Sequence, residues 1–221
     1  MAERISKAEW KRRRKRKRMI RKYSILGALA LIVILLLILI VKFISFLFSG
    51  NDGVIKKAGS HKIKNNILEI SENVRPGEEM KSVKGIVVHS TNKPGLSADD
   101  LLKSYKNSSG TKDKYESVHF IIDSDGVIMQ CIPTDEIAFH AMGRNSDTIG
   151  IMFCHTNTDG QMTESTQKAL KDLLVKLCKE YKLSTKDIFL HYDINGKMCP
   201  AYYAENAESW QNFLKEVSDK L

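Results

Sequence analysis

The longest hydrophobic segment of the chain lies close to its amino end. Residues 23–41 are uncharged and mostly aliphatic, and a helix of this length covers about 28 Å, close to the hydrocarbon thickness of a bilayer. Residues 43–48 extend the apolar stretch beyond Lys42. The run is longer than a typical leader core, and no small-residue cleavage site follows it. The pattern predicts an uncleaved transmembrane signal anchor over residues 23–48. The alternatives are a cleaved leader and a buried helix.

Beyond residue 68, short apolar runs alternate with amphipathic segments. Apolar residues recur at helical spacing from Leu170 to Tyr181, and Thr163 is a candidate N-cap ahead of them. The polar stretch from Asp123 to Gly126 separates two apolar runs and indicates a hairpin. We expect strands at residues 83–88, 118–122, 127–132, 148–153 and 188–190, and helices at residues 97–105, 163–181 and 205–217. This order predicts an α/β domain with a central mixed sheet flanked by helices.

Charge is concentrated ahead of the hydrophobic segment. Residues 1–22 hold twelve of the 35 Lys and Arg residues and two of the 26 Asp and Glu residues, so the rest of the chain is nearly neutral. The net charge of +9 therefore belongs to the tail, and we expect no nucleic-acid binding by the folded part. Basic residues beside a membrane segment stay in the cytoplasm and meet anionic headgroups of the cytoplasmic membrane.

These patterns divide the chain into four parts. Residues 1–22 form a basic cytoplasmic tail, residues 23–48 the anchor, residues 49–68 a linker rich in Gly, Lys, Asn and Ser, and residues 69–221 an extracellular domain. The last part is long enough for one hydrophobic core. The predicted location is the cell membrane, crossed once, with the domain facing the cell wall.

Two histidines follow predicted strands directly. His89 ends the run at residues 83–88, and His191 ends the run at residues 188–190. Ligands of open α/β sheets bind at the carboxyl ends of the strands, so we expect both imidazoles at one edge of the sheet. Imidazole is a preferred zinc ligand.

A lysine and a cysteine follow the second histidine within ten residues. Pro200 favours extended backbone at Cys199, and side chains two residues apart on an extended chain point the same way, so Lys197 and Cys199 are expected to face one site. Two imidazoles and a thiolate would leave the fourth position of a tetrahedral Zn²⁺ open for water, as in catalytic zinc sites.

Other histidines and cysteines have simpler interpretations. His119 falls on a predicted strand and is expected to be structural, and Cys178 falls on an apolar helix face and is expected to be a buried thiol. Cys131 and Cys154 end two predicted strands, and a disulfide between them outside the membrane is a question that geometry decides.

Five segments of the sequence are informative when they are taken together. They are Gly85-Ile-Val-Val-His-Ser-Thr91, Val118-His-Phe-Ile-Ile-Asp-Ser-Asp-Gly126, Ile137-Ala-Phe-His-Ala141, Asn145-Ser-Asp-Thr-Ile-Gly-Ile151 and His191 through Pro200. In this order and spacing the chain resembles the type 2 N-acetylmuramoyl-L-alanine amidases, the zinc family that includes phage lysozyme-like amidases and peptidoglycan recognition proteins. The resemblance runs from about Val83 to Trp210.

The resemblance implies a role for each matching residue. It implies that His89, His191 and Cys199 bind zinc, that Lys197 is the catalytic lysine, and that His140 lies on the substrate groove near the metal. It also implies hydrolysis of the peptidoglycan amide between muramic acid and L-alanine, with the muramic acid and the stem peptide as the groups recognised.

Two positions depart from the family pattern. Many members have a glutamate where Met152 stands, and others a tyrosine where Val118 stands. Both residues are implicated in proton transfer or in orienting the zinc water, so the general base stays open, with Tyr115 and His140 among the candidates. The departures also keep an alternative open, a membrane-anchored sensor that binds stem peptide with little or no catalysis.

Overall fold

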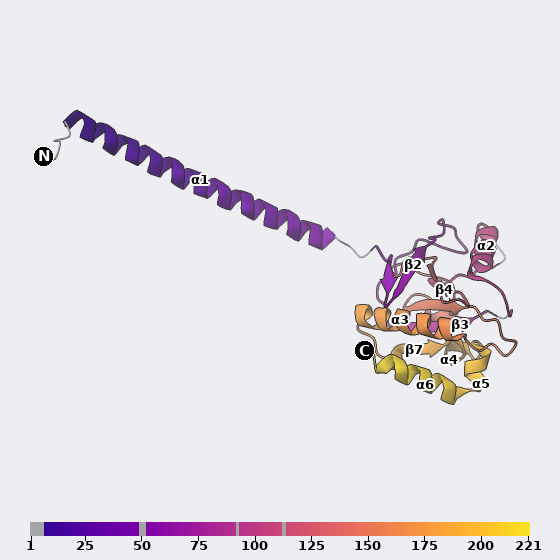
Figure 1. Ribbon diagram of the computed structural model, residues 1–221. Helices are drawn as coiled ribbons and strands as arrows, with labels where there is room; N and C mark the ends of the chain where they lie inside the picture. Colours follow the sequence, from indigo (N-terminus) through magenta and orange to yellow (C-terminus); the bar gives the residue numbers. More distant parts are fainter. Residues whose placement is uncertain (1–6, 49–51, 92, 112–113) are drawn as a thin grey trace. The chain divides into compact units, whose positions relative to one another are not determined.

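The structure, a computed structural model, describes residues 7–48, 52–91, 93–111 and 114–221 (Figure 1). The chain divides into two compact units, residues 1–50 and residues 51–221. The hydrophobic segment and the predicted domain are therefore separate units.

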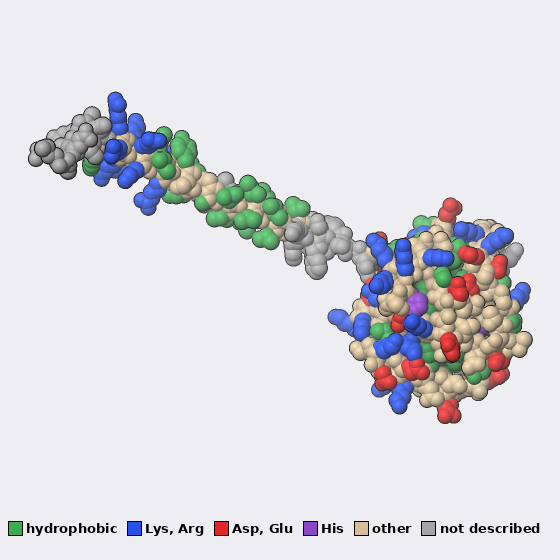
Figure 2. All heavy atoms as spheres, in the orientation of Figure 1, with side chains coloured by type: hydrophobic (Ala, Val, Ile, Leu, Met, Phe, Trp, Pro, Cys, Tyr) green, Lys and Arg blue, Asp and Glu red, His purple; other side chains and the backbone are tan. Residues whose placement is uncertain are grey.

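The described part of the first unit is one helix, α1 (Lys7–Phe48). Lys and Arg side chains gather along residues 12–22 of this helix, and hydrophobic side chains cover the stretch that follows (Figure 2). By length and composition residues 12–41 could cross a membrane, and no other helix of the described ranges has this property. The predicted anchor is thus helical throughout. Nothing in its structure distinguishes a membrane anchor from a leader.

The second unit is built on one mixed sheet, as predicted. Its strands lie in the order β1-β2-β5-β4-β6-β3-β7. The pairs β1/β2 and β4/β5 are antiparallel, and the other neighbours are parallel. The strands are β1 (Lys57–Ala58), β2 (His61–Asn65), β3 (Gly85–Ser90), β4 (Phe120–Ile122), β5 (Ile128–Gln130), β6 (Thr148–Phe153) and β7 (Ile188–Leu190).

Helices cover the two faces of this sheet unequally (Figure 1). On one face lie α3 (Glu164–Tyr181) and α6 (Ala207–Ser218), and on the other lies α2 (Ala98–Ser108). Ser97 and Thr163 cap α2 and α3 as predicted. Shorter helical segments are η1 (Met142–Arg144), η2 (Thr185–Asp187), α4 (His191–Asn195) and α5 (Ala201–Glu205).

Alternation along the strands assigns each residue to one face. On β6, Ile151 and Phe153 pack with α3 and α6, whereas Met152 packs with α2. On β3, Ile86 and Val88 belong to the first group, so the next residue, His89, points to the α2 face. A groove of about 1120 Å³ lies on this second face and includes residues of α2 in its wall.

The structure differs from the predicted linker over residues 49–68. Residues 57–65 form the hairpin β1–β2 at the edge of the sheet, and Ile55, Ala58 and Ile63 are buried in the core. Because one face of an edge hairpin is solvated, the buried apolar residues are few and lie among Lys, Gly, Ser and Asn residues, so the segment has the composition of a loop. The folded unit therefore begins before residue 69.

Candidate active site

Parallel strands bring the two predicted histidines together. His89 is next to last in β3, and His191 directly follows β7 as the first residue of α4. Because Val88 is opposite Leu190 in the register of these strands, both histidines reach the same edge of the sheet. Their Nδ1 atoms lie 3.1 Å apart.

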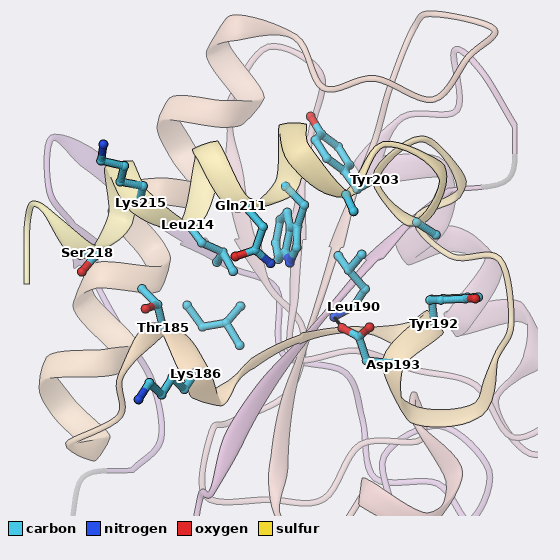
Figure 3. Close-up of a pocket in the computed structure, with 14 residues that line it drawn as sticks. Thr185, Lys186, Leu190, Tyr192, Asp193, Tyr203, Gln211, Leu214, Lys215 and Ser218 are labelled. Atoms are coloured by element: carbon cyan, nitrogen blue, oxygen red, sulfur yellow. Dashed lines mark hydrogen bonds between the residues drawn. The ribbon is translucent and has the colours of Figure 1, made fainter.

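Residues of α4 also line a second cavity, of about 530 Å³, which is shown in Figure 3. Asp193 lies beside Leu190 in this view, and its Oδ2 accepts a hydrogen bond of 2.8 Å from the Leu190 backbone N–H. Ile188 and Leu190 of β7 and Trp210 and Leu214 of α6 supply its apolar wall. The lining of this cavity includes none of the metal-ligand candidates.

Cys199 completes a cluster of three donors. The backbone N–H of Tyr192 donates to the Cys199 carbonyl over 2.9 Å, which ties the cysteine to α4. Ring nitrogens of His89 and His191 and the Cys199 sulfur all lie within 4.8 Å of one another, and the three residues are buried. Two imidazoles and one thiol at this spacing fit a zinc ion in their donor chemistry and in their convergence. The three residues predicted as a set are thus brought together.

Burial sets the protonation of these donors. It lowers the pKa of His89 well below the usual 6.5, and the neighbouring His140 and His191 act in the same direction. Burial also lowers the pKa of His191, and the ammonium of Lys197 adds to this effect. Burial raises the pKa of the Cys199 thiol. The imidazoles are therefore neutral and able to donate a lone pair, whereas the thiol must lose its proton when a metal binds.

His140 and His119 lie next to the cluster and differ in their contacts. His140 Nδ1 is 3.2 Å from His89 Nε2, and the pKa of His140 is lowered by burial to about 3. His119 accepts a hydrogen bond from the Gly150 backbone at Nδ1 and donates from Nε2 to the Glu136 carbonyl, both over 2.9 Å. Burial lowers the pKa of His119 to about 4. Both of its ring nitrogens are used by backbone, which agrees with the structural role expected for it.

The other residues predicted to take part in catalysis or metal binding line the groove. Lys197, His140 and Cys199 line it together with both family-departure positions, Met152 and Val118. Met152 is opposite His89 in the register of β3 and β6. The four cysteines are free, so Cys131 and Cys154 are two separate buried thiols.

Three further residues at the site were not predicted from the sequence. Asn195 Nδ2 lies 3.0 Å from His191 Nε2, four residues along α4, a short helix that was not predicted. Gly150 lies in the middle of an apolar strand, where a glycine signals a close approach by another group. Glu116 lines the groove and pairs with Lys114, and no sequence pattern singled it out.

The part of the chain that contains this site matches a known protein family. A family model described as N-acetylmuramoyl-L-alanine amidase matches residues 79–202, more than half of the chain. The N-acetylmuramoyl-L-alanine amidase CwlL of Bacillus licheniformis is 32% identical over 173 residues, which are 72% of this chain and 48% of CwlL. The amidase BlyA of Bacillus subtilis is 29% identical over 178 residues, 71% of this chain and 47% of BlyA. This chain thus spans about half the length of these relatives.

Solved structures share the fold of the second unit. A mutant endolysin from Bacillus subtilis has a TM-score of 0.59 and 28% identity, and the match covers 71% of this chain and 99% of the endolysin. The PlyG catalytic domain has a TM-score of 0.61 at 19% identity, covering 72% of this chain and 94% of that domain, and supports the fold alone.

Proposed function

Because this chain belongs to the N-acetylmuramoyl-L-alanine amidase family, we propose that it is a zinc-dependent hydrolase of the amide bond between N-acetylmuramic acid and L-alanine in peptidoglycan. One observation carries the proposal, the convergence of His89, His191 and Cys199 at one point of a groove large enough for a sugar and a peptide. Cell-wall cleavage or remodelling is the biological role that this chemistry would serve.

The three donors would hold the zinc ion through one ring nitrogen each of His89 and His191 and through Sγ of Cys199. When bound, zinc would supply a Lewis acid that polarises the scissile carbonyl and activates water. The chain's own residues then have to bind the substrate, stabilise the negative charge that develops on the carbonyl oxygen, and move a proton to the leaving amine.

Lys197 is suited to the charge-stabilising role. Its exposed side chain lines the groove, and its positive charge is close enough to lower the pKa of both His89 and His191. An ammonium beside the ligands would stabilise the oxyanion of the tetrahedral intermediate.

Glu116 is our candidate for the proton-transfer role that the family patterns leave open. Its carboxylate lines the same groove as the cluster, and its charge adds slightly to the rise in the Cys199 pKa that burial causes. Ser117 fixes this segment, because its N–H donates to the Phe139 carbonyl over 2.9 Å and its hydroxyl accepts from the Phe139 N–H over 3.0 Å. A carboxylate can accept a proton at neutral pH, whereas a phenol in general cannot.

The alternative is a peptidoglycan sensor without turnover. Met152, opposite His89, has no ionisable group at the position where many relatives have a glutamate, and this favours the sensor. The same zinc site and groove would then bind stem peptide and release no product.

We further propose that α1 anchors the domain in the cell membrane, with the basic end in the cytoplasm and residues 51–221 outside. The helix has the length and apolar composition to cross a bilayer, and its basic residues precede the apolar stretch. By the positive-inside rule this order directs the amino end to the cytoplasm. The anchor would limit cleavage to wall within reach of the membrane.

Purified residues 51–221 with zinc should release new L-alanine amino termini from peptidoglycan. Cys199→Ser should abolish this release and weaken zinc binding by more than the ~10–100-fold that loss of an outer-sphere partner costs. Cys178→Ser, which changes a buried cysteine of α3, should leave both unchanged. Full activity in Cys199→Ser would reject the ligand assignment. Stoichiometric zinc and muropeptide binding without release by the wild type would favour the sensor.

Lys197→Ala should lower kcat by about 10²–10³ and leave zinc affinity at the wild-type value, because the ammonium stabilises developing charge without binding the metal. The measurements are steady-state kinetics on a soluble muropeptide and zinc titration with a competing chelator. Lys186→Ala, a lysine on the second cavity, is the matched control and should behave as the wild type. An unchanged kcat for Lys197→Ala would remove this lysine from the mechanism.

Glu116→Gln should lower kcat by about 10²–10⁴ with zinc affinity retained, because the amide cannot take up the proton. Lys114→Met separates this role from the ion pair, since it removes the partner of Glu116 and leaves the carboxylate. It should retain most of the activity. Equal losses in the two variants would mean that the ion pair matters and that Glu116 transfers no proton.

The full chain should sediment with membranes after alkaline washing, because a spanning helix is held by its apolar length. Protease added outside intact cells should digest residues 51–221 and leave a short protected fragment carrying the basic tail. A chain starting at residue 51 should stay in the soluble fraction when made in the cytoplasm. Release of the full chain by the alkaline wash would contradict the anchor.

A further inference from the structure

A chain of hydrogen bonds runs from the backbone of β6 through His140 to His89. His140 Nε2 lies 3.1 Å from the Thr148 carbonyl oxygen, and His140 Nδ1 lies 3.2 Å from His89 Nε2. A carbonyl oxygen only accepts, so His140 carries its proton on Nε2 and its Nδ1 is an acceptor in the neutral ring. His89 must then donate from Nε2. Its Nδ1 is left without a proton, facing His191 Nδ1.

We propose that His140 is a positioning residue, which fixes the tautomer and the ring orientation of His89 so that the Nδ1 lone pair is free for the metal. The proposal rests on the zinc site of the proposed function. It differs from the role of general base, for which His140 was a candidate, because both ring nitrogens of His140 are engaged within the protein.

The backbone of β6 is shaped to receive this ring. A Cβ added at Gly150 would lie 2.5 Å from His140 Cγ, closer than such contacts occur. Glycine weakens the interior of a strand, and here it gives the imidazole room to lie against the sheet. Thr148, whose carbonyl accepts from His140, is two residues away on the same strand and fully buried. One short stretch of β6 therefore supplies both the space and the acceptor that hold His140.

His89 needs this hydrogen bond from its second nitrogen if it is to bind a metal. A ligating imidazole needs the correct nitrogen deprotonated and the ring aimed at the metal, and its partner through the other nitrogen secures both. Loss of such an outer-sphere partner typically costs 10–100-fold in metal affinity. His119, a buried histidine whose ring lies beside that of His140, has no hydrogen bond to His89 among the described contacts, and both of its ring nitrogens bond to backbone.

The test compares zinc affinity among variants of the full chain in detergent, by competition with a chromophoric chelator. His140→Leu keeps bulk and removes the acceptor, and we expect about 10–100-fold weaker binding. His140→Asn puts an amide oxygen near the position of Nδ1, and we expect affinity close to the wild type. The control is His155→Leu, a buried histidine that bonds to the Thr91 and Asn157 carbonyls. It should lower the melting temperature of the metal-free protein and leave zinc affinity unchanged.

The tautomer of His89 is also measurable in the wild-type protein. Long-range ¹H–¹⁵N correlation spectra of the metal-free chain should show the proton of His89 on Nε2 and none on Nδ1. A proton on Nδ1, wild-type affinity in His140→Leu, or equal losses in the Leu and Asn variants would each overturn the proposal. Wild-type protein that binds no zinc would overturn the metal site itself, and the proposal with it.

Discussion

The parallel pairing of β3 with β7 is the constraint on which the site depends. It brings His89 and His191, 102 positions apart in the sequence, to one edge of the sheet. The strand β3 is also paired along its whole length with β6, so its register is fixed from both sides. A slip of one residue would turn His89 toward α3 and α6, because side chains alternate between the faces of a strand. The convergence of the proposed metal ligands is therefore a consequence of sheet register, and the same hydrophobic core that stabilises the fold keeps these side chains together.

Burial and the charge of Lys197 act in the same direction on the two imidazoles and in opposite directions on the thiol. Burial keeps both imidazoles neutral, which is the form that donates a lone pair. It opposes ionisation of the Cys199 thiol, but the positive charge of Lys197 lowers the pKa of that thiol and of both histidines. Each of these effects of Lys197 favours the form of the side chain that binds a metal. The lysine proposed to stabilise the oxyanion thus also favours the charge state that the metal site requires.

Local patterns predicted most of the sheet and all the long helices, because each has a periodic apolar face or a capping residue. Thr163 and the stripe ending at Tyr181 gave α3 almost to the residue. The hairpin β1–β2 was missed because its few buried residues are separated by polar and charged ones. Its place in the fold depends on distant contacts, namely pairing with β5 and the hydrogen bonds of Asp172 of α3 to Ser60 and His61. Contacts such as His140 with His89 depend on distances across the sheet, and no spacing along the chain encodes them.

The proposed metal ligands and the proposed proton-transfer residue lie on different segments of the chain. A glutamate in place of Met152 would belong to β6, opposite His89, and would share the rigidity of the sheet. Glu116 instead belongs to the segment before β4, where Ser117 is bonded to Phe139 and the Tyr115 ring packs edge-on against the Phe139 ring 5.3 Å away. Phe139 directly precedes His140, so one short segment fixes both the proposed base and the residue that orients His89. Changes in this segment can alter proton transfer while the register that assembles the three donors is unaffected.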